Sequence, residues 1–99
     1  MNFRLIFKPK AEQDIGEGRD YYSQIRAKLG TDFLTEIDQC VKLILANPFR
    51  RAEVFKSIRQ VHLHRFPYMM SYLIENDSII VIAVTHNRRH SRLWKSRLP

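Results

Sequence analysis

The first residues of the chain alternate between two faces, as those of a β-strand do. Phe3, Leu5 and Phe7 occupy every second position, and the cationic Arg4 lies between two of them. This two-residue period is typical of a strand that buries one face. Pro9 ends the pattern, because proline has no backbone N–H for a sheet but fits the first turn of a helix. We therefore expect a strand before Pro9 and a helix after it.

Helical spacing replaces the alternation after Pro9. The apolar residues that then share one helical face are Ala11, Ile15, Tyr22, Ile25 and Leu29. Acidic residues occupy the first half of this segment, and Arg26 and Lys28 lie near its end, an arrangement that the helix dipole favours. Glycine is a common residue after a helix end. The pattern predicts that the first helix ends at Gly30.

A second and more hydrophobic helix is expected to begin near Gly30 or Thr31 and to end at Asn47 and Pro48. Its broad apolar stripe consists of Phe33, Leu34, Ile37, Cys40, Val41, Ile44 and Leu45. Because Cys40 lies on this stripe, we interpret it as a small buried residue and not as a nucleophile. The two helices are predicted to form a hairpin with their apolar faces against a sheet.

Three more strands are predicted in the second half. They cover Gln60–His64, Tyr68–Glu75 and Ile79–Thr85, and the polar stretch Glu75–Ser78 forms a tight turn. The last strand is apolar on both faces, so it should be central, with the N-terminal strand beside it. The sequence predicts one α+β domain over residues 1–99. It consists of an N-terminal strand, a helical hairpin and a three-strand antiparallel meander, with two helices backing a curved four-stranded sheet.

The net positive charge lies in the second half of the chain. Residues 1–49 contain seven Lys or Arg and seven Asp or Glu, so their charges balance. Residues 50–99 contain ten Lys or Arg and only Glu53, Glu75 and Asp77 as acids, which accounts for the whole net charge of +7. A field of one sign favours polyanions or an acidic protein partner.

Several protein classes are disfavoured by composition. The longest apolar run, Ile79–Val84, is far shorter than a membrane span. The N-terminus lacks the apolar core and cleavage site of a signal peptide. Cys40 is the single cysteine, so no internal disulfide can form. We therefore expect a cytoplasmic protein without membrane association.

No metal or cofactor site is expected. The four histidines are His62, His64, His86 and His90. Acidic or cysteine residues do not accompany them in sequence, and the neighbouring arginines would repel a cation. The chain also lacks a glycine-rich phosphate loop.

Cationic side chains near the strand ends are the remaining candidates for function. The predicted basic surface consists of Arg59, His62, His64, Arg65, His86, Arg88, Arg89 and Trp94. Arginine binds phosphate or carboxylate through two parallel hydrogen bonds, and an indole offers a stacking surface. This chemistry fits either RNA or an acidic protein surface.

Structural roles compete with this interpretation for some of the same residues. Arg59 and Arg65 could form ion pairs with helix acids such as Glu17 or Asp20, and Trp94 could pack against the C-terminal turn. Tyr22 and Tyr72 are expected in the core rather than on a contact surface.

The sequence resembles the ParE/RelE superfamily of type II toxin–antitoxin toxins, and in particular its ParE-like branch. The resemblance covers about residues 7 to 97. Its segments are "DIGEGRDYYSQIRAKLGTDFLTEI", "NPFR" and "IRQVHLHRFPYMMSYLIENDSIIVIAVTHNRRHSRLWKSR". It implies a curved antiparallel sheet backed by a helical hairpin. It also implies a small basic toxin that is encoded with an antitoxin.

Two mechanisms are known in this superfamily. RelE-like members cleave messenger RNA on the ribosome with strand lysines, arginines and a C-terminal tyrosine. The resemblance places Gln60, His62, Met69 and Trp94 at most of those positions, and only Arg88 or Arg89 matches. Methionine cannot bind phosphate, and an indole cannot exchange a proton as a phenol does.

ParE-like members lack that catalytic set and inhibit DNA gyrase, so gyrase inhibition is our expectation. The alternative is ribosome-dependent RNA cleavage, with His62, His86, Arg88 and His90 as the catalytic residues, because histidine titrates near neutral pH. A third possibility is an inactive relative that only binds an antitoxin. The expected partners are a cognate antitoxin, in a toxin–antitoxin hetero-oligomer, and DNA gyrase or, in the alternative, the ribosome with messenger RNA.

Overall fold

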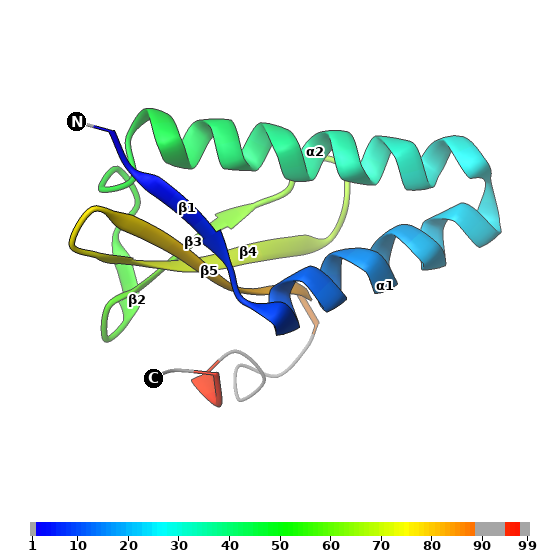
Figure 1. Ribbon diagram of the computed structural model, residues 1–99. Helices are drawn as coiled ribbons and strands as arrows, with labels where there is room; N and C mark the ends of the chain where they lie inside the picture. Colours follow the sequence, from blue (N-terminus) through cyan, green and yellow to red (C-terminus); the bar gives the residue numbers. More distant parts are fainter. Residues whose placement is uncertain (1, 89–94, 98–99) are drawn as a thin grey trace.

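The computed structural model describes residues 2–88 and 95–97 and has two layers, a helical hairpin and a sheet (Figure 1). The elements in chain order are β1 Arg4–Phe7, α1 Pro9–Ile25, α2 Ala27–Ala46, β2 Glu53–Phe55, β3 Ile58–His62, β4 Tyr68–Glu75 and β5 Ser78–His86. The α+β class, the helical hairpin and the three-strand meander are confirmed.

The sheet has five strands in the order β1-β5-β4-β3-β2. Strand β1 lies beside β5, as expected, and pairs with it in parallel, so the sheet is mixed and not wholly antiparallel. The helical hairpin carries the chain from β1 at one edge of the sheet to β2 at the other edge. The chain then returns to β5, and this long connection allows β1 and β5 to pair in parallel. The expectation of four strands was wrong, because β2 was missed. This strand has only three residues, and their exposure shows no clear alternation.

The boundary between the helices differs from the prediction. Helix α1 ends at Ile25, and the extended residue Arg26 separates it from α2. Gly30 therefore lies inside α2 and is buried. A Cβ at Gly30 would lie 1.9 Å from Ser23 Oγ and 3.0 Å from the Arg19 carbonyl oxygen. The glycine allows the two helices to approach closely and does not end a helix.

An aromatic cluster fills the core between the hairpin and the sheet. Phe33 is fully buried on α2, and its ring packs edge-on against Phe66 and Tyr68 at 5.4 and 5.1 Å. Tyr72 is also fully buried and donates its hydroxyl to the Pro48 carbonyl at 2.8 Å. Tyr72 is a core residue, as predicted.

Cys40 is confirmed as a core residue with 4% of its surface exposed. Burial, together with the nearby Glu36 charge and against the opposing effect of Arg51, raises the pKa of the Cys40 thiol to about 11. A thiol with that pKa is almost entirely protonated at neutral pH, which is the opposite of what a nucleophile requires.

The turn between β4 and β5 has the predicted position. Glu75 pairs with Ser78 and closes a two-residue loop in which Asn76 has a φ of 57°. Strand β3, by contrast, runs over Ile58–His62 instead of Gln60–His64. The Leu63 N–H still donates to the Tyr68 carbonyl at 2.9 Å, and the chain turns away at His64 and Arg65, whose backbone N–H groups bind a helix side chain.

Candidate functional site

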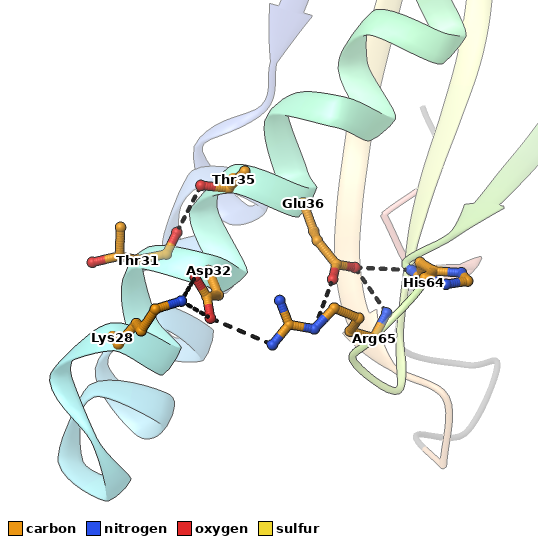
Figure 2. Close-up of polar contacts among 7 residues, drawn as sticks. All are labelled: Lys28, Thr31, Asp32, Thr35, Glu36, His64 and Arg65. Carbon is orange, nitrogen blue, oxygen red and sulfur yellow. Dashed lines mark hydrogen bonds and ion pairs between the residues drawn. The ribbon is translucent and has the colours of Figure 1, made fainter.

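One carboxylate attaches the loop between β3 and β4 to α2. Glu36 Oε1 accepts the backbone N–H groups of His64 and Arg65, both at 2.9 Å (Figure 2). The Glu36 side chain projects from α2 toward the loop and is only 7% exposed. Leu63 and Phe66 are buried on either side of these two residues. The loop is therefore held in place while the His64 and Arg65 residues remain exposed.

The Arg65 guanidinium pairs with acids of α2. Its Nη2 lies 3.4 Å from Asp32 Oδ2, and its Nε lies 3.8 Å from Glu36 Oε2. The suggested ion pair with a helix acid therefore exists, but the acids are not Glu17 or Asp20. A side-chain hydrogen bond from Lys28, with smaller effects of the Lys28 and Arg65 charges, lowers the pKa of Asp32. Arg65 is thus a partly neutralised cation at the edge of α2.

The Arg59 side chain makes structural contacts with the segment that follows α2. Its Nε donates to the Arg51 carbonyl oxygen at 2.7 Å, and its guanidinium lies 5.3 Å from the Phe49 ring centre. These contacts tie β3 to the segment after α2. Arg59 lies on β3, beside β2, whereas His86 and Arg88 lie on the other side of β4.

His86 and Arg88 lie together at the end of β5. The His86 ring packs edge-on against Tyr68 with ring centres 5.4 Å apart. Its Nδ1 accepts the Arg88 backbone N–H at 3.1 Å, and the Asn87 N–H donates to the Pro67 carbonyl at 2.7 Å. The turn after β5 is therefore fixed both to the β3–β4 loop and to a side chain of its own strand.

An open groove separates this turn from α1. Its volume is about 700 Å³, and we call it the α1–β5 groove. The lining residues are Asp14, Glu17, Gly18, Tyr21, Tyr22, Ile25, Pro67, Tyr68, Val84, Thr85, His86 and Arg88. Tyr21 and Ile25 are 58% and 60% exposed, so the groove has an accessible apolar wall beside the His86 ring and the Arg88 cation. Such a groove suits the apolar side chains of a peptide.

Tyr22 is partly buried between α1 and the core, in line with the expectation of a core role. Its ring contacts those of Phe66 and Tyr68, with centres 4.6 and 6.1 Å away. Burial raises the pKa of Tyr22, and the neighbouring Tyr68 and Tyr21 add to the effect. The phenol is therefore neutral at physiological pH and forms a wall of the groove.

Asp14 and Arg97 cover the edge of β5 beyond the last residue of β1. Asp14 Oδ2 accepts the Val84 backbone N–H at 2.9 Å and a hydrogen bond from Arg97 Nη1 at 2.5 Å. Arg97 Nη1 also donates to the Ile82 carbonyl at 3.2 Å. Two side chains thus satisfy backbone groups that β1 does not reach. No local sequence pattern indicates this pair, because its members are 83 positions apart.

His62 and His86, two histidines of the alternative catalytic set, lie on opposite faces of the sheet. His62 pairs with Met69 and His86 pairs with Tyr68, and these two neighbours on β4 point to opposite faces of the sheet. His86 is on the face that carries the helices, and His62 is on the other. Gln60 donates to Ser71 Oγ at 3.1 Å. Arg89, His90 and Trp94 lie outside the described residues.

Residues 2–88 and 95–97 contain no group of three or more His, Cys, Asp or Glu side chains that could hold a metal ion. Within the same residues, neither α1 nor α2 is long and apolar enough to cross a membrane.

Comparisons with known proteins identify relatives. Residues 5–91 match the family model of the ParE toxin of the type II toxin–antitoxin system parDE. The fold is similar to a chain of the chromosomal ParDE toxin–antitoxin system from P. aeruginosa, with a TM-score of 0.75 and 17% identity over 85% of this chain and 95% of that one. It is also similar to a mutant of the E. coli toxin RelE in the free state, with a TM-score of 0.63 and 13% identity over 98% and 94% of the two chains. No curated protein sequence matches significantly.

Proposed function

This chain belongs to the ParE family of toxins of type II toxin–antitoxin systems, and from this premise we propose that it stops growth by inhibiting DNA gyrase. A toxin of such a module has a cognate antitoxin as its partner. The proposal requires the toxin to act in the cytoplasm, where gyrase and the chromosome are found. It treats the protein as an inhibitor that works by binding and not as an enzyme.

The separation of His62 from His86 is the observation that carries the proposal. General acid–base cleavage of RNA needs a proton donor and a proton acceptor within hydrogen-bond reach of one phosphate. The register of β3, β4 and β5 puts these two histidines on opposite faces of the sheet. Gln60 and Met69 occupy strand positions where RelE-like enzymes carry cations, and neither can supply a charge. Inhibition by binding requires only a complementary surface.

Purified toxin should therefore block supercoiling by gyrase and increase the amount of cleaved DNA trapped with the enzyme. The same preparation should leave messenger RNA intact on programmed ribosomes. Addition of the cognate antitoxin should restore supercoiling, which controls for contaminating nuclease. Ribosome-dependent cleavage without an effect on gyrase would overturn the proposal, and His62, His86 and His90 would then be the first residues to replace.

Replacement of Arg88 and Arg89 together by alanine tests the predicted basic surface. We expect a loss of inhibition of about tenfold or more, since hydrogen bonds to charged groups are worth roughly 1.5–3 kcal/mol. Lys8→Ala with Lys10→Ala is the matched control, because it removes two exposed charges from the other half of the chain. Equal inhibition by the two double variants would show that Arg88 and Arg89 do not contact the target.

A further inference from the structure

Glu36 holds more than a single loop. The two N–H groups that it accepts belong to consecutive residues, His64 and Arg65, and both donate to the same oxygen. Glu36 is 6% exposed, so its carboxylate has lost most of its contact with water. The charge-assisted hydrogen bonds to the loop compensate for this loss. The backbone of the β3–β4 loop therefore has a fixed position relative to α2.

The same loop fixes the turn that follows β5. Two residues after Arg65, the Pro67 carbonyl accepts the Asn87 N–H at 2.7 Å. The next N–H in the turn, that of Arg88, donates to His86 Nδ1 at 3.1 Å. A continuous series of contacts thus connects the carboxylate on α2 with the backbone of Arg88.

We propose that Glu36 is a positioning residue of the toxin, which sets the spacing between Arg65 of the β3–β4 loop and Arg88. A preformed arrangement of cations binds a complementary surface without the cost of ordering mobile side chains and loops. The carboxylate lies behind the loop and does not itself need to touch the target. This inference rests on the proposed function only where toxicity is measured.

Asp32 provides an internal control for the role of Glu36. It lies one helical turn before Glu36 and binds the Arg65 side chain at 3.4 Å, as Figure 2 shows. Asp32 binds the Lys28 and Arg65 side chains, and no backbone group of the loop is among its contacts in the described part of the chain. Loss of Asp32 should therefore remove one of the two acids that pair with the Arg65 side chain and leave the loop backbone in place.

The experiment compares Glu36→Ala with Glu36→Gln, Asp32→Ala and Ile44→Val in the full chain. The amide oxygen of glutamine can still accept both N–H groups, so Glu36→Gln should rescue the alanine variant. Ile44 is 1% exposed in the core side of α2, and its valine variant controls for a general loss of stability. Backbone hydrogen exchange and growth arrest on induction are measured for each variant.

Glu36→Ala should accelerate exchange at His64, Arg65, Asn87 and Arg88 by about tenfold or more, and arrest should require about tenfold more protein. Glu36→Gln should remain close to the parent in both measurements, and Asp32→Ala should remain close to the parent in backbone exchange. Unchanged exchange at Asn87 and Arg88, or toxicity of Glu36→Ala equal to that of Ile44→Val, would overturn the proposal. If the parent arrests growth without inhibiting gyrase, only the gyrase proposal fails, because both readouts are independent of the target.

Discussion

At the residue scale, Thr85 is a polar residue in the interior of the protein. It is 3% exposed, and its Oγ1 has no hydrogen-bond partner within the described residues. Valine has nearly the same shape and lacks the hydroxyl, so Thr85→Val should stabilise the fold by about 1–2 kcal/mol. Thermal unfolding would test this, with Thr85→Ser as a control that keeps the hydroxyl and loses a methyl group. A lower melting temperature for Thr85→Val would mean that the hydroxyl is bonded in solution.

The buried thiol offers a second test at this scale. A pKa of about 11 for Cys40 keeps the thiolate scarce at neutral pH, and burial blocks access as well. A thiol-specific reagent at pH 7 should therefore label the native protein at the rate of unfolding and the denatured protein at the rate of a free thiol. Raising the pH toward the pKa increases the thiolate fraction, so native labelling should accelerate only in strongly alkaline solution. Rapid labelling of the native chain at pH 7 would contradict this account.

At the element scale, periodicity predicted the two helices but not the residue that separates them. The apolar face continues smoothly through Ile25 and Leu29, so the sequence pattern contains no interruption there. The actual break is at Arg26, whose backbone is extended, and Ser23 of α1 then lies against Gly30 of α2. Such a contact between helices is not a local property. The short strand β2 was missed for a similar reason, because its pairing with β3 defines it more than its own pattern does.

Gly30 gives a prediction for the packing of the helical hairpin. A methyl group there would meet Ser23 Oγ at 1.9 Å, so Gly30→Ala should destabilise the fold by about 1–3 kcal/mol. Gly16→Ala is the matched control, since its Cβ would meet only Arg19 Nη2 at 3.8 Å. That variant should be neutral or stabilising by up to about 1 kcal/mol, from helix propensity alone. Equal melting temperatures for the two variants would show that the helices can separate without cost.

At the scale of the whole molecule, the sequence predicted the charge asymmetry and most of the strand order, but not how the basic residues are divided. Arg59 and Arg65 are held by the segment after α2 and by α2 itself, whereas His86 and Arg88 line the α1–β5 groove. The partner of each basic residue can lie far away in the sequence. Asp14 and Arg97, for example, are 83 positions apart. Pattern and composition identify the residue types of the site. Only the tertiary structure shows which of these residues lie together.

The charge asymmetry leads to the last prediction, for the complex with the cognate antitoxin. All of the net charge of +7 arises from residues 50–99, so an acidic antitoxin should be attracted over long distances. Raising the salt concentration from about 0.1 M to about 1 M shortens the Debye length from about 10 Å to about 3 Å. The association rate should therefore fall steeply, while the dissociation rate changes little, because apolar contacts in a groove are not screened. Surface-based kinetics at several salt concentrations would measure both rates, with Lys8→Ala plus Lys10→Ala as the control for charge outside the basic half. An association rate that does not respond to salt would show that the one-sided field does not guide the encounter.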